Sequence, residues 1–154
     1  MEIQISFQKP IPQLEERKIK RKMEKVLKDL DCDDRELSIL FTDDREMSEL
    51  NSRYRAKEGT TNVLAFAMDE SGAAEDGGLT LRSAMLGDVV ISLDRAQQES
   101  MEFGETLQQR VETLLVHGVL HLVGYDHEKN EEEALLMEGM EKRLLALIGF
   151  KNEE

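Results

Sequence analysis

The chain is expected to adopt an α+β fold, in which one small mixed, largely parallel β-sheet of about four strands packs with about five helices. Two observations predict this fold. Segments with the apolar or alternating pattern of strands are interleaved with segments whose apolar residues recur at helical spacing. The first of them come in the order strand, helix, strand, which is typical of a crossover unit with a parallel pair of strands. No repeat or low-complexity tract divides these segments.

The N-terminal segments are a strand and an amphipathic helix. Residues Ile3 to Phe7 alternate apolar and polar side chains, as a half-buried strand does, and Pro10 and Pro12 follow. From about Gln13 to Leu30, apolar residues recur at helical spacing. Basic residues fill most of the remaining positions of this helix, namely Arg17, Lys18, Lys20, Arg21, Lys22, Lys25 and Lys28. Such a face is either simply solvated or a binding surface, and the sequence leaves both interpretations open.

The middle of the chain contributes two strands with a short helix between them. Glu36 to Phe41 has the pattern of a strand, and Asp43 with Glu46 three residues later is a capping-box pattern that opens the helix. Asn62 to Phe66 is the next predicted strand. The stretch Asp69 to Thr80 is rich in Gly, Ala and acidic residues without periodicity, and this composition predicts a mobile surface loop.

The C-terminal half contains one buried strand and three helices. Met85 to Ser92 is apolar and β-branched enough for a buried strand, and the helix after it, Leu93 to Phe103, is expected to stop at the glycine that follows. Thr106 and Gln109 form a second capping-box pattern, which starts the next helix. The last helix is predicted from about Glu131 to Gly149.

Length and composition predict a single domain over residues 1–154, located in the cytoplasm. The chain has 154 residues, of which 40% are hydrophobic and 34% charged, and this suits one ordinary globular core. Its one cysteine, Cys32, cannot form an internal disulfide, and the N-terminus lacks the basic flank and apolar run of a secretory signal. No apolar stretch approaches the roughly 20 residues of a membrane-spanning helix, so no membrane partner is expected.

The net charge of −13 argues against a protein that coats nucleic acid nonspecifically. Proteins of that class release counterions from the nucleic acid through a basic surface. We therefore expect weak, salt-sensitive binding to free RNA and no binding to DNA. A local basic face can survive an acidic total, however, because basic residues crowd the first predicted helix.

All three histidines of the chain lie between positions 117 and 127. His117 and His121 are four positions apart, so on a helix their directions differ by only roughly 40° and both rings can reach one ion. Gly124 is a natural left-handed stop residue, which lets the chain reverse and bring His127 back towards the other two. Three imidazoles leave one position of a tetrahedral zinc ion open, as in catalytic sites. Zinc held by His117, His121 and His127 is therefore the predicted cofactor.

The histidine spacing matches the zinc helix of the metzincin proteases, with one departure. Gly118 stands where those proteases have the glutamate that acts as general base. The sequence thus predicts a metzincin-like zinc helix without the base of a peptidase. Two other interpretations stay open. The histidines belong to the core or surface of a helix that happens to end in glycine, or they form a closed structural site completed by a carboxylate from elsewhere in the chain.

The segment from His117 to His127 reads His-Gly-Val-Leu-His-Leu-Val-Gly-Tyr-Asp-His. With it the chain resembles the YbeY-type family, bacterial rRNA maturation factors described as zinc-dependent single-strand endoribonucleases, whose signature is His-Gly-x-Leu-His-Leu-x-Gly-Tyr-Asp-His. The resemblance continues upstream, in the family's order, through Leu50-Asn51, Tyr54-Arg55, Thr61-Asn62-Val63-Leu64 and Leu86-Gly87-Asp88. It departs at Ala65-Phe66-Ala67, where the family usually has Ser-Phe-Pro. This departure bears on a serine hydroxyl or a proline turn, not on the zinc.

The resemblance implies an α+β domain with zinc on His117, His121 and His127, and a functional arginine at Arg55. It also implies hydrolysis of single-stranded ribosomal RNA, especially 3′-end maturation of the small-subunit RNA, and a part in ribosome quality control. The implied partners are ribosomal RNA and the ribosome or its proteins. Arg55, with Arg53 and Lys57 near it in sequence, would hold the phosphate beside the metal on His117. The alternative role of Arg55 is a surface salt bridge.

Two other functions compete with this one. A metalloprotease or amidase is favoured by the histidine spacing and weakened by Gly118. A ribosome-associated binding protein, whose zinc only stabilises the fold, would dock through the basic helix. Asp126 also has two interpretations, because it either orients a ligand histidine through a hydrogen bond or serves as a turn residue.

Overall fold

The structure is a computed structural model that describes residues 2–8, 10–55, 61–67, 85–126 and 128–149, with the side chains of Tyr54 and Arg55 excepted. Helices and strands follow one another in a single order along these residues. They are β1 (Glu2–Phe7), α1 (Glu16–Asp29), β2 (Glu36–Thr42), α2 (Asp44–Arg55), β3 (Val63–Ala67), β4 (Met85–Ser92), α3 (Leu93–Phe103), α4 (Leu107–Leu122) and α5 (Glu131–Leu147). The predicted loop from Asp69 to Thr80 lies outside the described residues.

The four described strands form one mixed sheet in the order β1-β2-β4-β3. β1 pairs with β2 and β2 with β4 in parallel, whereas β3 is antiparallel to β4 at the sheet edge. The strand, helix, strand order at the N-terminus is therefore a crossover between parallel neighbours, as predicted. The expected α+β fold, with about four strands and about five helices, is confirmed.

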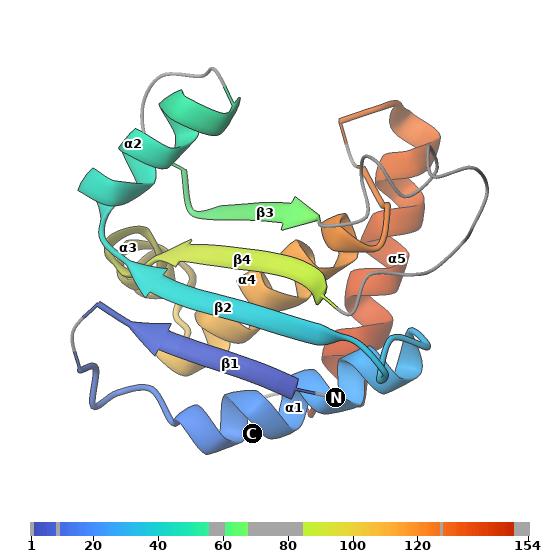
Figure 1. Ribbon diagram of the computed structural model, residues 1–154, viewed down its shortest axis with the longest axis horizontal. Coiled ribbons are helices and arrows are strands. Elements are labelled where there is room, and N and C mark those ends of the chain that lie inside the picture. The colour runs from blue at the N-terminus through green and yellow to red at the C-terminus, as the bar shows by residue number, and fades with distance from the viewer. Residues whose placement is uncertain (1, 9, 56–60, 68–84, 127, 150–154) are drawn as a thin grey trace.

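Alternate residues of the strands face two different helical layers. In β2, Ile39 and Phe41 belong to the main core, which joins the sheet to α1, α4 and α5. Leu40 points the other way, into a smaller cluster around Met47 of α2. Figure 1 shows α4 crossing behind the sheet and α1 running along its β1 edge. The sheet thus separates α4 from α2.

Local signals are present at the end of α3 and at the start of α4. The capping box predicted at Thr106 and Gln109 is present: the Thr106 hydroxyl accepts from the Gln109 N–H, and the Gln109 side chain accepts from the Thr106 N–H, each at 3.0 Å. Gly104 ends α3 in the left-handed conformation, with a φ of 67°. Both signals act within a few residues of one another, which is why the sequence predicts them.

At α2 only half of the predicted capping box forms. Asp43 accepts from the Glu46 N–H at 2.9 Å, as predicted. The Glu46 side chain does not return a hydrogen bond to Asp43; it accepts from the Thr42 hydroxyl and from the Gln8 amide instead. Hydrogen bonds from Thr42 on β2 and from Gln8, just after β1, therefore replace the second half of the local motif.

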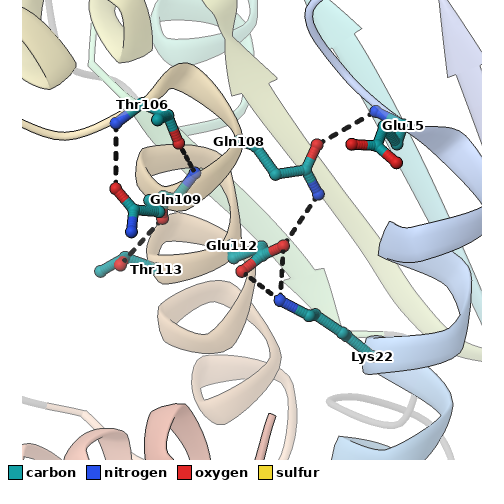
Figure 2. A network of polar contacts seen from close by, with 7 residues as sticks. All are labelled: Glu15, Lys22, Thr106, Gln108, Gln109, Glu112 and Thr113. Atoms are coloured by element: carbon teal, nitrogen blue, oxygen red, sulfur yellow. Dashed lines mark hydrogen bonds and ion pairs between the residues drawn. The ribbon is translucent and has the colours of Figure 1, made fainter. Parts of the chain in front are cut away.

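A residue of α4 supports the start of α1. α1 begins at Glu16, later than the predicted start at about Gln13, and no side chain caps it. The Glu15 N–H instead donates to the side-chain oxygen of Gln108 at 3.0 Å (Figure 2). One orphan donor of the helix start is thereby satisfied by a residue that is far away in sequence.

Gln108 belongs to a buried polar network that ties α1 to α4 (Figure 2). Its Nε2 donates to Glu112 at 2.8 Å, and Lys22 Nζ donates to both Glu112 carboxylate oxygens at 3.0 Å. The Glu112 side chain is only 1% exposed and that of Lys22 15%. A buried carboxylate is costly unless it is paired and hydrogen-bonded, and here it is both.

Lys22→Met should lower the free energy of unfolding by about 3 kcal/mol, because it leaves the buried Glu112 carboxylate without its cation. Lys142→Met is the matched control, since Lys142 pairs with Glu138 on α5, where the two side chains are 78% and 59% exposed. A surface pair of this kind contributes less than about 1 kcal/mol. Urea denaturation measures both changes, and equal losses would show that the buried pair does not hold α1 on α4.

No helix within the described ranges is both long and apolar enough to cross a membrane.

Candidate metal centre

The last two turns of α4 carry His117 and His121 side by side. Their ring centroids are 4.8 Å apart, and the ring planes meet at 72°. Both side chains are partly exposed. This is the convergence that spacing by four residues on a helix predicts. Two imidazoles this close can bind one ion at the roughly 2.0–2.1 Å that zinc requires.

Glu141 of α5 contacts the first of these histidines. His117 Nδ1 is hydrogen-bonded to Glu141 Oε2, and the two side chains are 26% and 25% exposed. A neutral imidazole that donates from Nδ1 keeps the lone pair of Nε2 for a metal. Histidines that bind metal in proteins almost always donate their other ring N–H to a carboxylate, carbonyl or water. The partner of His117 therefore fits a metal ligand.

Gly118 brings α4 close to the sheet. A Cβ at this position would lie 2.8 Å from Cγ1 of Val89 and 3.4 Å from Cγ2 of Val63. Val89 is fully buried in β4, so it has little room to move away. Position 118 therefore faces the sheet, and a glutamate here would collide with Val89 before its carboxylate could extend.

A Schellman motif ends α4 at Gly124. The Tyr125 N–H donates to the Leu120 carbonyl at 3.0 Å, and the Gly124 N–H donates to the His121 carbonyl at 3.1 Å. Gly124 has a φ of 110°, a conformation that favours glycine. The predicted left-handed stop after the second histidine is therefore confirmed.

His127 lies outside the described residues, so its approach to the other two rings stays a prediction. Within the described part of the chain, no group of three His, Cys, Asp or Glu side chains is arranged to hold a metal ion. The donor types nevertheless fit zinc, which binds imidazole nitrogen well. A zinc site with three ligands from the protein would thus require His127, which lies outside the described ranges.

Two further residues were predicted at the site, Arg55 and Asp126, and the structure describes the side chain of Asp126 only. Arg55 is the last residue of α2, but its side chain lies outside the described part, so its catalytic role stays a prediction. Asp126 Oδ1 accepts from the Glu128 N–H at 3.0 Å. That contact is an Asx turn and supports the interpretation of Asp126 as a turn residue.

A hollow of about 520 Å³ on the α2 face of the sheet is separate from the histidine pair. Its walls include Leu40, Phe66 and Val90, with the carboxylates of Glu46 and Asp88. None of the described residues that line it is a histidine or a basic residue. Because α4 lies on the opposite face, this hollow is not part of the candidate metal centre.

A family model described as "Endoribonuclease YbeY" matches residues 4–149 of the chain. The chain belongs to the YbeY family. Endoribonuclease YbeY of Aquifex aeolicus is 43% identical over 131 residues, which are 85% of this chain and 82% of that relative. Endoribonuclease YbeY of Syntrophotalea carbinolica is 44% identical over 126 residues, or 81% of each chain. The solution structure of TM1509 from Thermotoga maritima matches with a TM-score of 0.64 at 25% identity, and the match covers 95% of this chain and 88% of that one.

Membership of the YbeY family confirms the resemblance seen at the histidine segment, but one residue of the site was not anticipated from the sequence. Glu141 lies four positions after Met137 and three before Leu144, both of which are buried in α5. These three side chains share the face that packs against the core. A carboxylate on the apolar face of the helix that follows the zinc helix was the signal for this residue.

Gly118→Ala should destabilise the protein by about 1 kcal/mol or more, because overpacking against Val89 outweighs the higher helix propensity of alanine. Gly139→Ala is the matched control in α5, since a Cβ there has nothing within 4 Å. It should stabilise the protein by about 0.5–1 kcal/mol. Thermal and urea unfolding report the two signs, and stabilisation by both substitutions would contradict the close approach of α4 to β4.

Proposed function

We propose that this YbeY family member is a zinc-dependent endoribonuclease that cleaves single-stranded RNA. The observation that carries the proposal is the His117 and His121 pair on α4, with Glu141 hydrogen-bonded to His117. The names of the curated relatives, Endoribonuclease YbeY, support RNA as the substrate. His127 is the third ligand in this proposal.

When bound, zinc would act as a Lewis acid and lower the pKa of water towards neutrality, which supplies a nucleophile for phosphodiester hydrolysis. Two residues of the chain have tasks beside the metal. Glu141 holds the His117 proton on Nδ1 and so presents Nε2 to the metal. Arg55 binds the phosphate and offsets the charge that builds on its oxygens in the transition state.

The proposed RNA is ribosomal, as the family resemblance implies. The activity is then 3′-end maturation of the small-subunit RNA, together with ribosome quality control, and the ribosome or its proteins supply the specificity. The cytoplasm is the compartment in which this RNA is processed, and the one cysteine, Cys32, is free and buried, which suits a reducing environment.

Metal analysis joined to a cleavage assay tests the proposal. Wild-type protein should bind one zinc ion and cut single-stranded RNA, and chelation should abolish cleavage until zinc is restored. His117→Ala should lose both the metal and the activity. Arg55→Ala should keep the metal but cut RNA about 100-fold more slowly, the scale of removing one transition-state donor. Cleavage that survives unchanged in His117→Ala would point to a contaminating nuclease and leave the proposal without support.

The same samples separate the competing functions. A peptide pool that is cut by the zinc-loaded protein while RNA stays intact would indicate a metalloprotease or amidase. Zinc loss that lowers thermal stability and ribosome binding together, in a protein that never cleaves RNA, would indicate a binding protein whose zinc is structural. The proposed activity requires RNA cleavage and intact peptides.

Glu141→Leu should weaken zinc binding by about 10–100-fold, because the partner of His117 Nδ1 is lost. Glu141→Gln should lose less, since its amide oxygen still accepts the hydrogen bond. Glu138→Leu, one turn earlier on α5 and 59% exposed, is the control and should leave zinc affinity unchanged. Competition with a chromophoric chelator measures all three affinities. Equal affinities in Glu141→Leu and Glu138→Leu would remove Glu141 from the metal centre.

A further inference from the structure

The outward face of α1 carries a stripe of basic side chains, here called the α1 basic stripe. It consists of Arg17, Lys18, Arg21, Lys25 and Lys28, which recur at helical spacing along one side of the helix. The apolar residues of α1 lie on the opposite side and are 0% exposed, namely Ile19, Met23, Val26 and Leu27. At about 1.5 Å per residue, the stripe runs for roughly 16 Å along the surface.

The charge of this stripe runs against that of the whole molecule. α1 contains seven of the 20 Lys and Arg residues and only three of the 33 Asp and Glu residues, so it is net positive in a chain of −13. One of those three acids, Asp29, is occupied by Arg143 of α5, whose guanidinium donates to it at 2.7 and 3.0 Å. The hydrogen bond to Asp29 also raises the pKa of Arg143 above its ordinary value. The two remaining acids of the helix, Glu16 and Glu24, are outnumbered by its seven cations, so the helix stays net positive.

The stripe residues also differ from several other cations of this acidic protein in making no ion pair. Lys22, for example, is paired with Glu112 and Arg110 with Glu99. Within the ranges that the structure describes, none of the five stripe residues takes part in an ion pair or a side-chain hydrogen bond. A row of unpaired cations in a protein with excess acid remains available to a polyanion.

We propose that the α1 basic stripe binds the phosphate backbone of the RNA substrate, apart from the candidate metal centre. The choice of RNA rests on the proposed function. A stripe of this length spans several phosphates, and basic side chains bind them by releasing counterions. An anionic membrane fits less well, because a surface-seeking helix inserts an apolar face, and the apolar face of α1 is buried in the core.

The position of the stripe determines how long an RNA must be to contact both the stripe and the candidate metal centre. Its C-terminal end meets α5 through Asp29 and Arg143, and two residues before Arg143 the same helix contacts His117 through Glu141. Positions two apart on a helix point to nearly opposite sides, so the stripe and the histidines are reached from different sides of α5. A long or folded RNA can contact both regions, whereas a strand of a few nucleotides occupies only the metal centre.

The test compares two triple variants with the same change in net charge. Arg17→Gln/Arg21→Gln/Lys25→Gln removes the middle and N-terminal part of the stripe but keeps Lys28, which lies in the last turn and favours the helix dipole. Arg45→Gln/Arg95→Gln/Lys142→Gln is the control and removes surface cations of α2, α3 and α5. Glutamine has about the helix propensity of arginine and lysine, and circular dichroism and urea unfolding verify the fold.

Binding is measured by fluorescence anisotropy in chelator, so that cleavage does not consume the labelled RNA of about 60 nucleotides. The stripe variant should bind at least about tenfold more weakly at about 0.1 M salt, and the slope of log K against log salt should fall by about 2. The control should stay close to wild type. Equal affinities and slopes in the two variants would overturn the proposal, as would stripe-dependent binding to anionic phosphatidylserine vesicles that is stronger than binding to RNA.

Cleavage of two RNA lengths by the zinc-loaded protein separates this inference from the proposed function. The stripe variant should cut an RNA of about 10 nucleotides at the wild-type rate and show a raised KM, with kcat unchanged, on the long RNA. If wild type cuts neither RNA but the stripe variant alone loses RNA binding, the stripe stands and the proposed nuclease activity fails. If wild type cuts both and the stripe variant matches it on both, the stripe fails alone.

Discussion

The approach of α4 to the sheet is closest at Gly118, where a single added carbon would meet the buried Val89 side chain at 2.8 Å. Because of this short distance, α4 packs on the sheet in an orientation that turns position 118 towards Val89. His117, the residue before Gly118, then lies towards α5. There it contacts Glu141, which shares a helix face with Met137 and Leu144. The position of the candidate metal centre is therefore a consequence of helix packing, because the contact that buries Gly118 leaves His117 and His121 partly exposed.

Apolar burial alone would not settle how α1 and α5 lie on α4, since it is non-directional. Two carboxylates supply the direction. Glu112 binds Lys22 of α1 from inside the core, and Glu141 of α5 binds His117 at a partly exposed position. The first pair is almost fully buried and supports the fold, whereas the second is about one quarter exposed and lies at the candidate metal centre. Burial thus distinguishes two contacts of similar chemistry.

The sequence predicts most of the features whose partners are neighbours in the chain, although only half of the capping box at Asp43 forms. The capping box of Thr106, the left-handed turn at Gly124 and the pairing of His117 with His121 each need only a few residues, and each is confirmed. Contacts between residues that are far apart in the sequence were not predicted. Glu141 contacts a histidine on another helix, and Gln108 accepts a hydrogen bond from the backbone just before α1. Nothing local distinguishes these side chains from solvated ones except an apolar helical face around them, which is a weak signal without knowledge of what packs there.

The inward position of Gly118 also bears on the chemistry of the site. In a zinc peptidase, a glutamate takes a proton from water and returns it to the leaving amine. Here that position faces Val89 of β4, and the carboxylate that contacts the histidine pair, Glu141, is hydrogen-bonded to His117. In the proposed reaction zinc would supply the nucleophile, and no side chain at position 118 could return a proton to a leaving amine. The packing of Gly118 therefore weakens the peptidase alternative that the histidine spacing alone would favour.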